Sequence, residues 1–258
     1  LTLEGGALRV SAGKVEAEIV AENPLEPQPP LVGAELLGSL PATEWAAALA
    51  LVMPVASTDQ SKSYSGILMQ GDRCVATDST ALVEVRLSRE VGGVLIPNRA
   101  AEVLAAHLKR GGETTLHTLG NDAEVALAAG SVRFYLSGQL AYYPDYERLI
   151  PCATACRATF DRDEFLGALG RAAAFSNSPN REVKIEFDDG VATFTTRREL
   201  SDTDTLRDEV ACRSEGPWKP LGLNAQIAAR AWAGAAENIT IGQDHALGTV
   251  VARRDGWL

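Results

Sequence analysis

Residues 130–151, GSVRFYLSGQLAYYPDYERLIP, form one half of an internal repeat. Ala129-Gly130-Ser131-Val132 and Pro144 lie 117 residues after Ala12-Gly13-Lys14-Val15 and Pro27. The apolar residues between these markers keep the same spacing. A period of this length indicates duplicated domains rather than the short units of a solenoid.

A second set of matches extends the repeat over the rest of the chain. Trp45 and Leu49 lie 120 residues before Phe165 and Leu169, and the run 95–98 lies 126 residues before the run 221–224. We therefore expect the last strands of one copy at 1–30, a complete copy at 31–151 and most of another at 152–258. Residue 1 falls inside a predicted strand and the last copy ends one strand early. The chain is thus expected to be trimmed, or to share a sheet edge with another chain.

Apolar periodicity and capping residues predict the α+β class, with two helices and about eight strands in each copy. The strands are expected to form antiparallel sheets that cover the helices. Helices are predicted at 43–53, 99–109, 164–175 and 224–235, begun by Thr43, Asn98, Asp161 and Asn224. Strands are predicted at 1–4, 7–12, 15–20, 66–70, 73–76, 81–87, 94–97, 114–118, 123–128, 132–136, 156–160, 183–187, 191–196, 206–212, 219–223, 239–241 and 248–252.

The composition is that of a soluble globular protein. Of its 258 residues, 46% are hydrophobic and 22% are charged, which is enough apolar material for a core. No apolar run is long enough to cross a bilayer, and the first ten residues lack the pattern of a signal peptide. We therefore expect a cytoplasmic protein without a membrane partner. A net charge of −10 argues against a generally basic surface, but a local basic patch remains compatible with it.

Side chains that could carry chemistry are scattered. The four cysteines are Cys74, Cys152, Cys156 and Cys212, and the three histidines are isolated, so reduced thiols are expected rather than a metal site or disulfides. Asp78, Ser79 and His107 do not have the spacing of a nucleophile with its base. Neither a phosphate-binding loop nor a dinucleotide fingerprint is found. We expect no catalytic residues, no metal and no cofactor.

Four short motifs occur in the same order as in one known family. They are Ala76-Thr77-Asp78, the segment 143–151, Phe175-Ser176-Asn177 followed by Arg181, and Gly222-Leu223-Asn224. On these motifs and the duplicated frame, the chain resembles the bacterial DNA polymerase III beta subunit, the beta sliding clamp. The resemblance extends from the end of the family's first domain through most of its third.

The resemblance implies a DNA clamp fold whose subunits, most simply two, close into a ring around duplex DNA. Helices line the hole, and basic side chains meet phosphates without reading bases. The residues implied to contact DNA are Lys62, Tyr64, Arg99, Lys109, Arg110, Arg171, Arg181 and Arg230. The predicted helix 43–53 contributes no basic residue. A solvated helix face is the alternative explanation for each of these positions.

The resemblance also implies a cleft between the second and third domains that binds linear peptides of the replicative polymerase and the clamp loader. The matching positions are Thr77, Ser79, Thr80, Ala81, Leu82, Pro144, Arg148 and Leu149. Ser79-Thr80-Ala81 replaces the family's Gly-His-Arg, and the family's C-terminal Met-Pro-Met-Arg-Leu wall is absent from the sequence. Ordinary packing between domains is the alternative for Leu82, Pro144 and Leu149.

Two functions therefore remain open. The first is a processivity clamp that encircles DNA and tethers its partners. The second is a clamp-like interaction module that keeps the fold without encircling DNA, because fold alone does not establish function. A six-domain ring could form from two subunits of three domains each, or from three subunits of two domains each.

Overall fold

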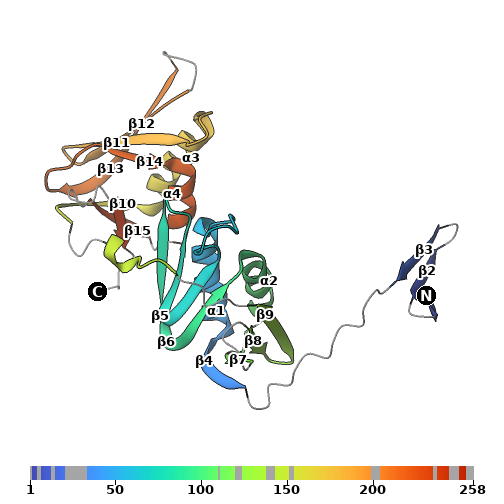
Figure 1. Cartoon of the computed structure of the whole chain (residues 1–258). Coiled ribbons are helices and arrows are strands. Elements are labelled where there is room, and N and C mark those ends of the chain that lie inside the picture. The colour runs from blue at the N-terminus through green and yellow to red at the C-terminus, as the bar shows by residue number, and fades with distance from the viewer. Residues whose placement is uncertain are drawn as a thin grey trace. The chain divides into compact units, whose positions relative to one another are not determined.

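The computed structural model describes residues 2–4, 7–12, 15–20, 34–109, 111–119, 124–137, 143–150, 154–198, 204–234, 237–243 and 250–253. Contacts divide the chain into two units, 1–33 and 34–258 (Figure 1). In the first unit, the strands β1 (Thr2–Glu4), β2 (Ala7–Ala12) and β3 (Val15–Val20) form an antiparallel sheet in that order. These strands match the three predicted from the alternating pattern.

The first half of the second unit packs two helices against strands. Its elements are β4 (Glu35–Pro41), α1 (Ala42–Val52), the 3₁₀ turn η1 (Met53–Val55), β5 (Ile67–Thr77), β6 (Leu82–Ile96), α2 (Asn98–Leu108), β7 (Glu113–Thr118), β8 (Glu124–Ala129) and β9 (Val132–Ser137). One antiparallel sheet has the order β4-β7-β8-β9, and β5 and β6 form a separate two-stranded ribbon. Fully buried Trp45, Leu49 and Leu104 bring α1 and α2 into one core with both sets of strands.

The second half repeats the order of elements with a larger sheet. It contains β10 (Cys156–Asp161), α3 (Arg162–Phe175), β11 (Glu182–Asp188), β12 (Val191–Arg197), β13 (Thr205–Glu215), β14 (Leu221–Asn224), α4 (Ala225–Trp232), β15 (Asn238–Gln243) and β16 (Val250–Arg253). The strand order is β14-β11-β12-β13-β10-β15-β16. A second core forms around Phe165, whose ring centroid lies 4.6 Å from that of Phe160 and 5.6 Å from that of Phe194.

The predicted α+β class is confirmed: the described residues contain four α-helices, two in each half, on antiparallel sheets. None of the described helices is long and apolar enough to cross a membrane. A strand at Glu35–Pro41 was not predicted from the alternating pattern. The repeat could have revealed it, because 39–41 lie 120 residues before the last three residues of β10.

The helix starts in the second half agree with the capping prediction, and those in the first half do not. The Asp161 carboxylate accepts from the backbone N–H groups of Asp163 and Glu164, and Asn224 caps α4 in the same way. By contrast, α1 and α2 begin directly after Pro41 and Pro97, without a side-chain cap. The predicted caps Thr43 and Asn98 are therefore wrong: Pro41 and Pro97 take the N-cap position in extended backbone, with ψ of 134° and 142°, and each helix starts one residue later.

Strand prediction also failed at the ribbon. The predicted pairs 66–70 with 73–76 and 81–87 with 94–97 merge into β5 and β6. Gly71, with φ of 59°, lies where the pairing register shifts, so the chain continues through an irregularity instead of turning. In the second half the corresponding chain does turn, at Asp189 and Gly190, and forms the hairpin β11–β12.

Candidate functional site

The residues predicted to contact DNA fall into two groups. Lys62, Arg99, Lys109 and Arg230 are exposed, and none forms an ion pair with another described residue. Arg99 lies on α2 and Arg230 on α4. These side chains are available for an external anion, whereas Arg110 lies outside the described residues.

Lys62 and half-buried Tyr64 lie in the loop between η1 and β5. The Asp59 carboxylate accepts from the Ser61 backbone N–H at 3.0 Å and from the Ser61 hydroxyl at 2.7 Å, and these bonds lower the pKa of Asp59. The Lys62 N–H donates to the Asp59 carbonyl. The loop therefore has a defined turn that holds Lys62 at the surface.

Two of the predicted DNA contacts are engaged within the chain. Arg171 Nε lies 2.7 Å from Asp208 Oδ2, an ion pair that joins α3 to β13. Arg181, with φ of 41°, donates to the carbonyls of Ala173 and Ser176 at the end of α3. A cation there compensates the unpaired carbonyls of the helix C-terminus. These contacts give both arginines a structural role.

The predicted cleft residues of the β5–β6 turn form a closed hydrogen-bonded loop. Asp78 Oδ1 accepts from the Thr80 N–H at 2.8 Å, the Thr80 hydroxyl at 2.7 Å and the Ala81 N–H at 2.8 Å. The Thr77 hydroxyl donates to the Ala81 carbonyl at 2.7 Å and accepts from the Ser79 N–H. Ser79 has φ of 77° and is exposed with Thr80. The turn thus presents a fixed, hydroxyl-rich surface.

The remaining predicted cleft residues lie on the connector, which we define as residues 143–150 with the 3₁₀ turn η2 (Glu147–Leu149). Pro144 is half-buried, and the Leu149 side chain is 61% exposed. Arg148 Nε lies 2.6 Å from Asp145 Oδ2, and the Arg148 side chain is 85% exposed. An exposed leucine beside a neutralised cation offers a partner an apolar contact.

A small apolar cluster brings the turn and the connector together. Leu68, Val75 and Leu95 of the ribbon are buried with Tyr146 of the connector, and Leu82, Tyr143 and Ile150 pack around them. The predicted cleft residue Leu82 therefore lies on the ribbon face that the connector covers. Burial raises the pKa of both Tyr143 and Tyr146.

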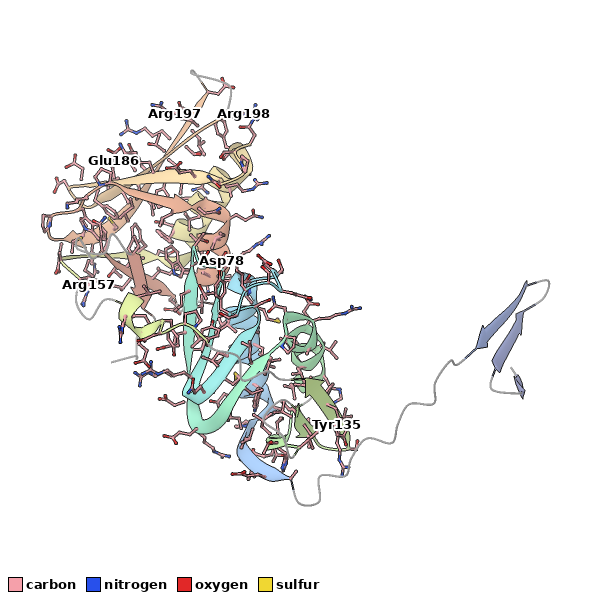
Figure 2. The ribbon with its side chains drawn as sticks, in the orientation of Figure 1. Asp78, Tyr135, Arg157, Glu186, Arg197 and Arg198 are labelled. Carbon is pink, nitrogen blue, oxygen red and sulfur yellow. The ribbon has the colours of Figure 1, made fainter. Side chains whose placement is uncertain are left out.

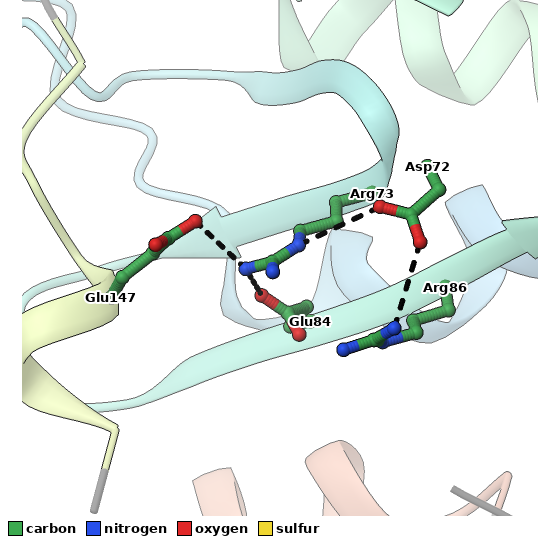
Figure 3. A network of polar contacts seen from close by, with 5 residues as sticks. All are labelled: Asp72, Arg73, Glu84, Arg86 and Glu147. Atoms are coloured by element: carbon green, nitrogen blue, oxygen red, sulfur yellow. Dashed lines mark hydrogen bonds and ion pairs between the residues drawn. The ribbon is translucent and has the colours of Figure 1, made fainter. Parts of the chain in front are cut away.

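Sequence reasoning missed the polar contacts beside this cluster. Arg73 Nη1 lies 3.1 Å from Glu84 Oε2 and 2.9 Å from Glu147 Oε1, which joins β5 to β6 and to the connector (Figure 3). The nearby Tyr146 hydroxyl, together with the carboxylates of Glu84 and Glu147, raises the pKa of Arg73. No local pattern marks Arg73, because its partners lie 11 and 74 residues away in the chain.

Groups with possible chemistry are few among the residues that the structure describes. Within them, no group of three or more His, Cys, Asp or Glu side chains could hold a metal ion. Burial raises the pKa of the Cys74 thiol to about 12, which makes it a poor nucleophile. The His107 ring packs edge-on against Phe134, with 5.2 Å between centroids.

Comparison with solved structures defines the class of protein by its fold. The DNA polymerase III beta subunit of Thermotoga maritima matches with a TM-score of 0.81 at 20% identity, covering 99% of this chain and 72% of that one. The DNA polymerase sliding clamp of Pseudomonas aeruginosa matches equally well, at 20% identity over 100% of this chain and 73% of that one. The chain has the DNA clamp fold.

Sequence comparison points to the same family. The beta sliding clamp of Caulobacter vibrioides is 26% identical over 166 residues, which is 60% of this chain. The matched region spans only 42% of that relative's length. No family model matches. The resemblance to the bacterial beta sliding clamp that the motifs predicted is confirmed.

Proposed function

We propose that the chain is the greater part of a sliding clamp subunit that encircles duplex DNA and tethers replication enzymes to it. The observation that carries this proposal is the match of the whole chain, duplicated halves included, to bacterial clamps at TM-scores of 0.81. The two separate cores, one within 40–129 and the other within 158–241, support clamp domains at 31–151 and 152–258. The strands at 1–30 would then close a preceding domain.

The DNA contact would be made by the exposed and unpaired cations Lys62, Arg99, Lys109 and Arg230, with Tyr64 beside Lys62. Such side chains attract phosphates without reading the sequence, which a protein that moves along DNA requires. Arg171 and Arg181 would contribute less, because their guanidinium groups already have partners within the chain.

Repeat symmetry supports ring formation. In this chain η1 of the first half packs against α4 of the second, and Ile227 and Ala231 of α4 reach the first core. Val55 of η1 is buried, but Phe175, 120 residues later at the end of α3, is only half-buried. We place the next subunit there, contributing a helix equivalent to α4. Each junction would then repeat head to tail, as a closed ring requires.

The partner site would include the hydroxyl-rich turn of Thr77, Ser79, Thr80 and Ala81 together with Leu82, Pro144, Arg148 and Leu149. Exposed Leu149 and the fixed turn support an extended peptide as the ligand. Polymerase and clamp-loader peptides are the partners that the family resemblance favours. We assign no catalytic step to the chain and place its activity with replication in the cytoplasm.

Retention on circular DNA tests the proposal. The complete protein is loaded onto nicked circular plasmid by its own clamp loader, and release is followed in high salt before and after the plasmid is linearised. A ring should stay on the circle and slide off the cut ends. Equal loss in salt from circle and line would contradict encirclement, because phosphate attraction alone is salt-sensitive.

The second candidate is a clamp-like interaction module that does not encircle DNA. It is favoured by the scarcity of cations on α1, where Glu44 is the only charged residue and binds the Ser88 backbone N–H and hydroxyl. This candidate predicts no loading onto the circle by an active loader, while binding of polymerase or loader peptides persists.

A further inference from the structure

The connector completes the ribbon by covering one of its faces. Side chains of a strand alternate between two faces, and on β5 both faces are apolar. Ile67, Met69 and Cys74 belong to the core that includes α1 and α2, whereas Leu68 and Val75 lie in the cluster with Tyr146. A two-stranded ribbon with one uncovered apolar face would be unstable in water. The connector is therefore part of the fold of the first half.

One guanidinium joins the connector to the ribbon. Arg73 binds the Glu147 carboxylate of the connector, and it binds Glu84 on the neighbouring strand. The Arg73 side chain is 28% exposed and that of Glu84 is 20% exposed, so the contact between them is partly shielded from water, whereas the Glu147 side chain is 63% exposed. Charge-assisted hydrogen bonds in a partly buried site are stronger than surface ion pairs. Arg73 thus ties the connector to both strands.

The residues that follow this anchor have little packing of their own. Arg148 and Leu149 are exposed, and η2 is closed by N–H groups of Leu149 and Ile150 that donate to the carbonyls of Tyr146 and Glu147. The turn is therefore positioned by Tyr146 and Ile150, which pack in the apolar cluster, and by the contact of Glu147 with Arg73, and only weakly by Leu149 itself.

We propose that Arg73 is a positioning residue for partner binding, which fixes the connector on the ribbon so that Arg148 and Leu149 are presented to a peptide in one geometry. This inference rests on the proposed peptide site for its function, but the anchoring itself can be tested without any ligand. The Arg73 side chain is 28% exposed and acts on the peptide site through Glu147.

The test uses the complete protein and four variants. Arg73→Met keeps the apolar stem and removes the hydrogen bonds, and Arg73→Lys restores the charge without the planar fork. Glu147→Gln removes only the negative charge that pairs with Arg73. Because the Glu147 side chain is 63% exposed, this variant will fold. Arg86→Met is the control for the rest of the network, because Arg86 binds Asp72, which lies 3.7 Å from Arg73 Nε, but has no ion pair with the connector (Figure 3).

Two readouts are ligand-free: amide hydrogen exchange of residues 143–150 and the rate of trypsin cleavage after Arg148. Arg73→Met should raise both by about fivefold, because an ion pair with a largely exposed partner contributes up to ~1 kcal/mol. Glu147→Gln should raise the exchange and cleavage rates less than Arg73→Met does. Arg73→Lys should give rates between those of Arg73→Met and the unmodified protein. Arg86→Met should leave both rates unchanged. Equal rates in Arg73→Met and the unmodified protein would overturn the proposal, as would an equal rise in Arg86→Met.

A third readout is the affinity for a synthetic peptide copied from the C-terminus of the replicative polymerase subunit of the same organism. Arg73→Met should weaken this binding by about fivefold, with Arg86→Met unchanged. If the unmodified protein does not bind the peptide, the proposed partner site fails, while the exchange and cleavage rates still decide the anchoring. Faster cleavage with unchanged peptide affinity would overturn the positioning role.

Discussion

The guanidinium of Arg198 lies over the ring of Phe175, 5.3 Å from the ring centroid. Phe175 is the last residue of α3, and Arg198 directly follows the exposed Arg197 at the end of β12 (Figure 2). The end of α3 lies 120 residues after η1 and therefore corresponds to it in the internal repeat. Within the chain, η1 packs against α4. A half-buried aromatic ring covered by a cation has the composition of a binding hot spot.

Phe175→Asp should therefore disrupt subunit association. Loss of an aromatic anchor costs about 2 kcal/mol or more, so the dissociation constant should rise by at least roughly 30-fold. Analytical ultracentrifugation over a concentration series measures this change. Val191→Asp is the control, because Val191 is an apolar residue exposed to 36% on the β11–β12 hairpin, away from this end of α3. Assembly of Phe175→Asp at the same concentration as the unmodified protein would exclude this face from the interface.

On the proposed DNA contact, Arg230→Ala should weaken binding to duplex DNA. Removing one cation that neutralises a phosphate lowers the slope of log affinity against log salt by about 0.9, and the weakening should be the same for unrelated sequences. Fluorescence anisotropy on duplex DNA at several salt concentrations gives the slope. Arg207→Ala serves as the control with the same change in charge, since Arg207 lies on β13, paired with Glu209 at 2.9 Å. An identical slope for both variants would remove Arg230 from the DNA-binding set.

Side-chain capping predicts different effects on stability for substitutions at the starts of α3 and α1. Asp161→Ala should lower the free energy of unfolding by about 1 kcal/mol, because two N–H groups of α3 lose their acceptor. Thr43→Ala should leave it nearly unchanged, since α1 begins before Thr43 and has no side-chain cap. Urea denaturation measures both. A loss in Thr43→Ala as large as that in Asp161→Ala would show that α1 starts where the sequence pattern placed it.

The Cys74 thiol should make stability fall at high pH. Burial raises its pKa from 9.0 to about 12, so between these values the unfolded chain releases a proton that the folded chain keeps. Release from the unfolded state favours unfolding, and the contribution of the thiol is fully present below pH 9 and is lost as pH rises toward 12. Thermal unfolding of the unmodified protein and of Cys74→Val from pH 8 to pH 10.5 measures the contribution of the thiol to the pH dependence of stability. Identical pH profiles for the two proteins would contradict it.

Much of the fold could be predicted because its signals are local or periodic. The 117-residue and 120-residue spacings indicated duplication, and alternation predicted most strands. Asp161 and Asn224 marked their helices, since a cap bonds to N–H groups two and three residues away. The family motifs likewise pointed to the clamp fold.

Other features depend on partners far apart in the sequence. Arg171 and Arg181 looked like free cations, yet Asp208 and the end of α3 engage them. The two strands predicted on either side of Gly71 form the single strand β5, because both segments pair with β6.

The sequence by itself thus determined the α+β class, the duplication and the resemblance to the sliding clamp, because periodicity and caps act over a few residues or repeat along the chain. Only the tertiary structure decided which charges are free and how the connector is held. Arg73 and Glu147 are 74 residues apart and meet at 2.9 Å only after the ribbon and the connector have packed. No local pattern encodes such a contact, since its energy exists only once distant segments are brought together.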